Sequence, residues 1–142
     1  LSYLLDGDNI RIGLNKDLGF TDDDRKENIR RISEVSRLML DAGLIVITAF
    51  ISPFEEEREL AKSLVKEENY FLVHVHCSVE KCEERDVKGL YKKARAGEIK
   101  NFTGIDSPYE IPKEPNLIVD TENETVKESV DKIFLAIADK IK

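Results

Sequence analysis

Two carboxylates stand two residues apart in the stretch Leu5–Asn9, which reads LDGDN and follows a short apolar run. Residues two apart on an extended strand point to the same side of a sheet, so this spacing predicts that Asp6 and Asp8 act together. At the carboxyl end of a strand, two carboxylates can hold a metal ion or accept a proton from a substrate hydroxyl. The alternative is an ordinary turn, because Asp, Gly and Asn are all favoured in turns.

Basic side chains follow this carboxylate pair closely. Guanidinium groups bind phosphate or sulfate through two parallel hydrogen bonds, so a cluster of them near a strand end indicates an anion site. For any single member, a solvated charge on a helix surface is the more common role. The cluster comprises Arg11, Lys16, Arg25, Lys26, Arg30 and Arg31.

A second stretch with functional potential is Phe50–Glu57, in which an apolar run is followed by Ser52, Pro53 and three glutamates. Ser52 as N-cap, Pro53 in the first helical position and Glu55 three residues after the serine predict the start of a helix. This interpretation accounts for Ser52 without a catalytic role. The backbone at this point could still line a ligand at the end of a strand.

The third stretch is strongly basic. Between Arg85 and Lys100, six basic residues stand against two acidic ones, and glycines interrupt the surrounding sequence. This pattern predicts a mobile lid, over about residues 86–106, that closes on phosphates and excludes water. A solvated charged helix is the alternative, although the isolated Phe102 could stack on a base.

Histidine and cysteine residues give no convincing metal site. His74 and His76 are two apart on an expected strand, but no third ligand accompanies them, and such histidines more often belong to a core or a sheet surface. Cys77 and Cys82 form a single C-x4-C pair, which is too little for a zinc site or a disulfide framework. We expect both cysteines to be reduced thiols.

Four apolar runs rich in β-branched and aromatic residues predict strands. Because these runs are continuous rather than alternating, they are typical of strands buried on both faces of a parallel sheet. Strands and helical segments alternate along the chain, which indicates βαβ units and therefore an α/β fold with a parallel sheet flanked by helices. Ligands of such sheets bind beyond the carboxyl ends of the strands. The runs are Tyr3–Leu5, Leu44–Ile51, Tyr70–Cys77 and Leu117–Val119.

Two expected helices have clear end signals. The first covers residues 22–42, with Thr21 as N-cap, acidic residues in its first turn and Gly43 just after its end. The last begins at a capping box formed by Thr125 and Glu128. The helical period predicts that the buried stripe of this last helix comprises Val130, Ile133, Phe134, Ile137 and Ile141.

The composition excludes several classes of protein. The sequence of 142 residues is 41% hydrophobic and 36% charged, which is typical of one globular domain. Its formal net charge of −7 argues against a nucleic-acid-binding surface. No apolar stretch approaches the roughly 20 residues that cross a bilayer, and Leu1–Leu5 lacks the basic flank of a signal peptide. We therefore expect a cytoplasmic protein that contacts neither membranes nor nucleic acid.

Several long motifs, in order along nearly the whole chain, resemble those of the adenylylsulfate (APS) kinases. These are P-loop enzymes that use ATP to phosphorylate the 3′-hydroxyl of APS, which gives PAPS in sulfate assimilation. The resemblance implies a three-layer P-loop NTPase fold of the nucleotide-kinase kind over residues 1–142 as one domain. It also implies a homodimer. Members of the family either stand alone or are associated with or fused to ATP sulfurylase. The motifs are LDGDNIR (Leu5–Arg11), GF-x4-R-x2-N (Gly19–Asn28), ITAFISP (Ile47–Pro53) and KGLYKKARAGEIKNFTGID (Lys88–Asp106).

The resemblance further implies roles for individual residues. Asp8 would be the carboxylate beside the attacking hydroxyl, and Asp6 would support it or hold Mg²⁺. Ser52 stands where the family pattern has a phosphoserine, although in-line transfer from ATP requires no such intermediate. The residues implied for APS are Arg11, Phe20, Arg25, Asn28, Ile51, Lys88, Asn101 and Phe102, with the two aromatic rings on either side of the adenine. Those implied for ATP are Arg85, Lys93, Thr121 and Glu124.

One departure from the family pattern concerns ATP binding. The sequence contains no G-x4-G-K-[ST] phosphate loop, which in the family precedes the strand that ends in DGDN. Since the sequence begins five residues before Asp6, we expect the first strand, the phosphate loop and the first helix to lie in a preceding segment. The alternative is an APS-binding or regulatory fragment without kinase activity. A kinase of another small nucleotide is a third interpretation.

Overall fold

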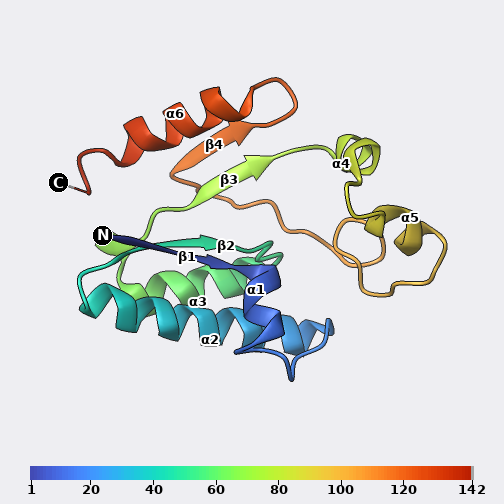
Figure 1. Cartoon of the computed structure of the whole chain (residues 1–142), viewed down its shortest axis with the longest axis horizontal. Helices are drawn as coiled ribbons and strands as arrows, with labels where there is room; N and C mark the ends of the chain where they lie inside the picture. Colours follow the sequence, from blue (N-terminus) through green and yellow to red (C-terminus); the bar gives the residue numbers. More distant parts are fainter. Residues whose placement is uncertain (142) are drawn as a thin grey trace. The chain divides into compact units, whose positions relative to one another are not determined.

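The computed structural model describes residues 1–141, which form two compact units. The first unit is Leu1–Tyr70 and the second begins at Phe71. Each unit contains one pair of parallel strands with helices beside it (Figure 1). The prediction of parallel strands flanked by helices is therefore confirmed, with the strands arranged as two pairs.

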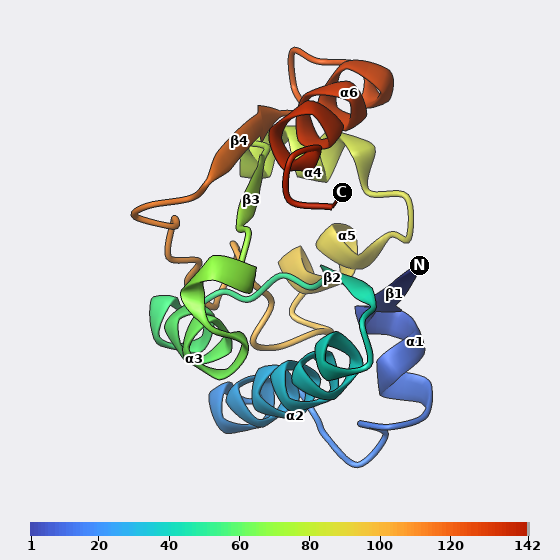
Figure 2. The ribbon, with the colours of Figure 1, turned by 90° about the vertical axis from the view of Figure 1, so that its left-hand side faces the viewer.

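The first unit is built around β1 (Ser2–Asp6) and β2 (Ile45–Ala49). The two strands run parallel, with Ser2 opposite Ile45 and Asp6 opposite Ala49, so both end at the same edge. The helices α2 (Asp22–Asp41) and α3 (Glu55–Val65) lie side by side on one side of this pair (Figure 1, Figure 2). Buried apolar side chains from strand and helices form its core, namely Leu5, Ile29, Ile32 and Val65.

The ends of α2 match the prediction closely. The Thr21 side chain accepts the backbone N–H of Asp24, and the Asp24 carboxylate in turn accepts the backbone N–H of Thr21, which completes a capping box. At the other end the helix stops at Asp41, and Gly43 adopts φ +82°, the left-handed conformation that glycine accommodates without strain. Both signals act within a few residues, so the sequence was sufficient to place this helix.

Both long predicted strands are shorter in the structure. The expected strand at Leu44–Ile51 ends at Ala49, because the chain then turns toward Ser52, whose φ is +43°. The expected strand at Tyr70–Cys77 reduces to β3 (Val73–His76), since a 3-10 helix, η1 (Glu67–Asn69), precedes it and its end runs into Tyr70. Apolar content marked these strands, but local turns decided their ends.

The second unit is built around β3 and β4 (Leu117–Asp120), which run parallel with Val73 opposite Leu117 and His76 opposite Asp120. Helix α6 (Val126–Ile137) lies beside β4 (Figure 1). Its capping box forms as predicted, with the Thr125 hydroxyl accepting the Glu128 N–H and the Glu128 carboxylate accepting the Thr125 N–H at 2.8 Å. Two short helices, α4 (Val79–Arg85) and α5 (Leu90–Arg95), complete this unit.

The predicted buried stripe of the last helix is wrong in this structure. Val130 is 55% exposed and Phe134 is 59% exposed, and Ile141 lies beyond the end of α6 at Ile137. A helical period identifies which side chains share a face, but it does not supply the surface that covers them. The two strands of this unit are too narrow a platform to cover the whole apolar face of a twelve-residue helix.

Within the described residues, no helix combines the length and apolarity needed to span a membrane.

Candidate functional site

The two carboxylates that follow β1 have different structural roles. Asp6 is the last residue of β1 and the N-cap of α1 (Gly7–Ile12), and its Oδ1 accepts the N–H of Asp8 at 3.0 Å. Asp8 lies in the first turn of α1. The prediction that both project from an extended chain is therefore wrong, because an Asp at a strand end readily caps a helix and the chain bends at Gly7. Both carboxylates still lie at the carboxyl end of β1.

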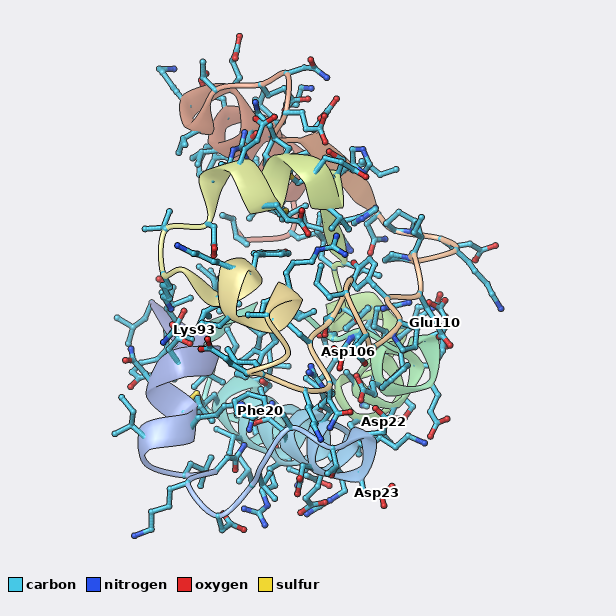
Figure 3. All side chains as sticks on the ribbon, turned by 90° about the vertical axis from the view of Figure 1, so that its right-hand side faces the viewer. Phe20, Asp22, Asp23, Lys93, Asp106 and Glu110 are labelled. Atoms are coloured by element: carbon cyan, nitrogen blue, oxygen red, sulfur yellow. The ribbon has the colours of Figure 1, made fainter. Side chains whose placement is uncertain are left out.

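Arg11 lies on the last turn of α1 and holds the loop before α2. Its Nη1 donates to the carbonyl of Gly19 at 2.8 Å and to that of Leu18 at 3.3 Å. Its guanidinium carbon lies 4.5 Å from the centroid of the Phe20 ring, which is a cation–π arrangement. Phe20 is 57% exposed and precedes the first turn of α2, where Asp22 and Asp23 lie (Figure 3). An exposed aromatic ring beside a fixed cation is therefore present at this loop.

Arg25 approaches the same loop from α2. Its Nε donates to the Phe20 carbonyl at 3.1 Å, and its guanidinium carbon lies 6.0 Å from the Phe20 ring centroid. Burial, and next the like charge of Arg25, lower the pKa of Arg11, while Asp24 acts in the opposite direction. Two guanidinium groups that repel each other beside one aromatic ring form a positive centre, which attracts an anion.

Three of the other predicted basic residues of this stretch form ion pairs. Arg30 pairs with Glu27 at 2.7 Å, and Lys26 pairs with Glu56 at 2.9 Å. Arg31 binds both Glu27 and Asp17, each at 2.8 Å. For these three residues, the interpretation as helix surface charges holds. Of the basic cluster, only Arg11 and Arg25 gather around Phe20 in the described contacts.

Asn28 lies on α2 one turn after Arg25 and is only 4% exposed. Its Oδ1 accepts a hydrogen bond from Nδ2 of Asn15 at 2.9 Å. Asn15 is fully buried in the loop between α1 and α2, and the sequence analysis did not single it out. No periodicity or motif marks a lone asparagine in a loop, so only the structure reveals it.

Ser52 does not cap a helix, so this prediction is wrong. Its φ of +43° is left-handed, and α3 begins at Glu55 with Phe54 in the N-cap position. Arg58, which is 4% exposed, explains the difference, because its Nη1 donates to the Ser52 carbonyl at 2.5 Å and its guanidinium also binds Glu55. Arg58 holds the loop from α3, and Ile51 beside it is 61% exposed. Ile51 is thus exposed on a loop whose backbone is held at Ser52 by Arg58.

In the second unit, Arg85 and Thr121 meet at the carboxyl ends of β3 and β4. Nη2 of Arg85 donates to the Thr121 carbonyl at 2.6 Å, and the Thr121 hydroxyl donates to the His76 carbonyl at 3.0 Å. Glu124 is held nearby by Lys132 at 2.5 Å and by the Ser129 hydroxyl at 3.2 Å, and the Lys132 hydrogen bond lowers the Glu124 pKa. Two of the residues expected for ATP are therefore in direct contact.

The basic segment folds into short helices joined by capped turns. Asp86 accepts the backbone N–H of Tyr91 and of Lys92, each at 3.0 Å, and so fixes the start of α5, which carries Lys93 (Figure 3). Asp106 accepts the backbone N–H of Asn101 at 2.9 Å and that of Phe102.

The Phe102 ring lies edge-on to Tyr91, with 4.9 Å between centroids. Burial raises the Tyr91 pKa to about 12. The Tyr91 ring thus packs against Phe102 in the T-shaped geometry that aromatic pairs favour. Lys88 lies in the turn between α4 and α5.

His74 and His76 both lie on β3. His74 is 7% exposed, and its ring centroid lies 5.7 Å from that of His76. Over the residues described, no group of three His, Cys, Asp or Glu side chains could hold a metal ion. Cys77 and Cys82 are both free thiols.

Parallel strands flanked by helices, with carboxylates at a strand end, define an α/β protein, and its two arginines around an exposed aromatic ring suit an anionic ligand. The family model described as adenylylsulphate kinase matches residues 1–120. The chain belongs to the adenylylsulphate kinase family, whose members are ATP-dependent phosphotransferases.

Named relatives agree with this membership. The chain is 57% identical to the adenylyl-sulfate kinase of Oceanobacillus iheyensis over 98% of this chain and 70% of the relative. It is 58% identical to that of Staphylococcus carnosus, with the same coverage. Among solved structures, the Mycobacterium tuberculosis APS kinase in complex with AMPPNP and APS is 44% identical, with a TM-score of 0.88 over 96% of this chain and 80% of that one.

Proposed function

We propose that this chain takes part in transfer of the ATP γ-phosphoryl group to the 3′-hydroxyl of APS, which gives PAPS and ADP. The observation that carries the proposal is the arrangement of Arg11 and Arg25 around the Phe20 ring. Guanidinium groups suit the phosphosulfate, and an exposed aromatic face suits the adenine. The relative from Mycobacterium tuberculosis, which holds AMPPNP and APS, supports this assignment.

Asp8 is proposed as the group that orients the attacking hydroxyl or accepts its proton. It lies in the first turn of α1, at the carboxyl end of β1. Asp6 has one oxygen engaged with the backbone of α1, which leaves its second oxygen to bind Mg²⁺ directly or through water. Bound Mg²⁺ supplies charge neutralisation for the transferring phosphoryl group.

The remaining APS contacts are proposed from the family motifs. Asn28 and the Ile51 backbone would bind APS, and Ser52 contributes its backbone rather than a nucleophile, because in-line transfer needs no phosphoserine. The motifs give Lys88 and Asn101 the same role, and the Phe102 ring, which packs against Tyr91, would stack on the adenine.

For ATP, Arg85 and Thr121 are the favoured contacts, since they meet at the carboxyl ends of β3 and β4. Lys93 on α5 would neutralise phosphate charge if the segment 86–106 closes as a lid. Glu124 already binds Lys132 and Ser129, so its proposed role at the ATP adenine is through the shape of the loop Thr121–Thr125.

The test is turnover of APS by the full-length protein. APS consumption should match ADP formation one to one, and AMP should not replace APS. Asp8→Ala and Arg25→Ala should each abolish turnover while the circular-dichroism spectrum stays unchanged. Unchanged rates in both variants would contradict the assignment, and efficient use of AMP would favour a kinase of another nucleotide.

Two parts of the proposal need separate measurements. APS binding without any Mg²⁺-ATP heat in calorimetry would favour a binding or regulatory role over a kinase. Light scattering coupled to gel filtration tests the expected homodimer, and a co-purifying ATP sulfurylase would support the association implied by the family.

A further inference from the structure

Asn15 is the residue that links the end of α1 to the middle of α2. It is 0% exposed, and its backbone N–H donates to the Ile10 carbonyl at 2.9 Å, which ties it to the last turn of α1. Its side-chain Nδ2 donates to Oδ1 of Asn28 at 2.9 Å, a bond buried from solvent. Side chain and backbone are thus both held, which suits a residue that sets the geometry of a neighbour.

Arg31 decides which way round the Asn15 amide lies. A guanidinium group only donates hydrogen bonds, so the atom that faces it must be an acceptor. Nη1 of Arg31 lies 3.5 Å from Oδ1 of Asn15. Arg31 is itself fixed by a fork to both carboxylate oxygens of Asp17, at 2.8 and 2.9 Å, and by a bond from Nε to Glu27 at 2.8 Å. The Asn15 oxygen therefore faces Arg31, and its NH₂ group faces Asn28.

The same logic fixes the amide of Asn28. Because Nδ2 of Asn15 is a donor, the oxygen of Asn28 must face it, and the Asn28 NH₂ group is then directed away from Asn15. Asn28 can offer a donor, but not an acceptor, to a ligand on that side. A phosphosulfate group and ribose oxygens accept hydrogen bonds, whereas an exposed carbonyl would repel the anion.

We propose that Asn15 is a positioning residue for APS recognition. Asp17 holds Arg31, Arg31 orients the Asn15 amide, and Asn15 in turn fixes the Asn28 amide with its NH₂ group toward the substrate. This inference rests on the proposed function, in which Asn28 contacts APS. Asn15 would then contribute to specificity without contacting the substrate, because it makes Asn28 present a hydrogen-bond donor to the acceptor oxygens of APS.

The test replaces the hydrogen-bond donor at position 15 with an acceptor. Aspartate has nearly the shape of asparagine but only accepts when ionised, and Arg31 lies in place to pair with it. In Asn15→Asp, the Asn28 amide must turn its NH₂ group inward and present its oxygen to the ligand. We expect APS affinity, measured by calorimetry on the full-length protein, to fall about ten- to a hundredfold.

A matched control separates this effect from the added charge. Asn69→Asp makes the same exchange at an exposed position after α3, where Nδ2 binds the Val65 carbonyl at 3.1 Å. This variant should bind APS like the wild type. The thermal midpoint of each variant shows whether it remains folded.

A double-mutant cycle identifies the route of the effect. If Asn15 acts through Asn28, then Asn15→Asp should weaken APS binding little further in an Asn28→Ala background. If it acts through its charge or through packing, the loss should be equally large in both backgrounds, and the proposal is overturned. Equal APS affinity of Asn15→Asp and the wild type would overturn it too.

A measurement on the wild type covers the case in which Asn15→Asp does not fold. On saturation with APS, the side-chain NH₂ signals of Asn28 should shift in nitrogen–proton correlation spectra, while those of Asn15 stay protected from exchange. Unmoved Asn28 signals alongside shifted Phe20 and Arg25 signals would exclude Asn28 as a donor to APS. Absence of any APS binding by the wild type would instead remove the proposed function itself.

Discussion

The guanidinium carbon of Arg11 lies 4.5 Å from the centroid of the Phe20 ring, while the same side chain donates to the Gly19 carbonyl at 2.8 Å. One arginine thus both shapes the loop and packs on the ring that the loop presents. The arrangement leaves Phe20 more than half exposed, so a second face remains for a ligand. As part of the proposed APS site, a loop preorganised in this way would lose little conformational entropy on binding.

The first prediction concerns charge at this loop. Arg11→Met removes a cation but retains a long apolar side chain, so we expect the KM for APS to rise about ten- to a hundredfold, as for a lost hydrogen bond to a charged group. The KM for ATP should change little. Arg37→Met is the control, since Arg37 pairs with Glu34 and Asp41 on α2. Similar KM values for APS in both variants would show that Arg11 is not part of the site.

The second prediction concerns the aromatic ring. Phe20→Leu should lower APS affinity about five- to a hundredfold, because base stacking contributes about 1–3 kcal/mol per aromatic side chain. Since Phe20 is 57% exposed, the free energy of unfolding should be nearly unchanged. Calorimetry and urea denaturation measure the two effects. Phe20→Trp should retain binding, and failure of that rescue would argue against stacking.

The third prediction separates the hydroxyl of Ser52 from its backbone. Glycine adopts the observed φ of +43° more easily than serine, so Ser52→Gly should preserve the loop and retain turnover. Arg58→Met should lower both stability and turnover, because it releases the Ser52 carbonyl and leaves Glu55 without this partner. Steady-state rates measure the turnover of both variants, and thermal midpoints measure their stability. Loss of all activity in a folded Ser52→Gly variant would point to an essential hydroxyl.

The fourth prediction separates capping from catalysis at the end of β1. Asp6→Ala should destabilise the protein by about 1 kcal/mol through loss of the α1 N-cap, whereas Asp6→Asn keeps an oxygen for the cap and should stay near wild-type stability. If Asp6 also binds Mg²⁺, Asp6→Asn should raise the Mg²⁺ concentration needed for half-maximal turnover. An unchanged Mg²⁺ dependence would leave Asp6 with a structural role alone.

The fifth prediction concerns acid stability. Hydrogen bonds from Arg30, and next from Arg31, lower the Glu27 pKa to about 2 from its ordinary value of 4.5. The contribution of Glu27 to stability is therefore complete above about pH 4.5 and is lost as pH falls toward about 2. Glu27→Gln should be less stable than the wild type at neutral pH, and the difference should shrink in acid.

Urea denaturation over a pH series measures this difference. Glu59→Gln, an exchange at an exposed position of α3, serves as the matched control. If the gap between Glu27→Gln and the wild type stayed constant through the acid range, ionisation of Glu27 could not be its cause.

The sequence predicted those features that depend on near neighbours. The N-cap at Thr21 and the capping box of Thr125 with Glu128 each depend on residues within one helical turn, so both were predicted without a structure. The spacing of basic residues predicted that Arg11 and Arg25 lie close together, whereas the place of Phe20 beside them was implied by the family motifs.

Other predictions failed where a distant or unexpected side chain intervened. Ser52 fits the pattern of an N-cap, but the buried Arg58 holds its carbonyl and moves the helix start to Glu55. The stripe on α6 has the period of a buried face, yet Phe134 is largely exposed. A pattern of residue types states a preference, and packing against other elements decides whether the preference is met.

The sequence by itself determined the parallel α/β class, the ends of α2 and the start of α6, because these follow from short-range patterns of polarity and hydrogen bonding. Only the tertiary structure decided how Asn15, thirteen residues before Asn28, fixes its amide, and how Arg85 meets Thr121 across 36 residues. Such pairs form when strands and helices bring remote backbone segments within hydrogen-bonding distance. No local sequence pattern predicts which remote residues will come that close, so the orientation of these hydrogen-bond donors is set by the tertiary structure.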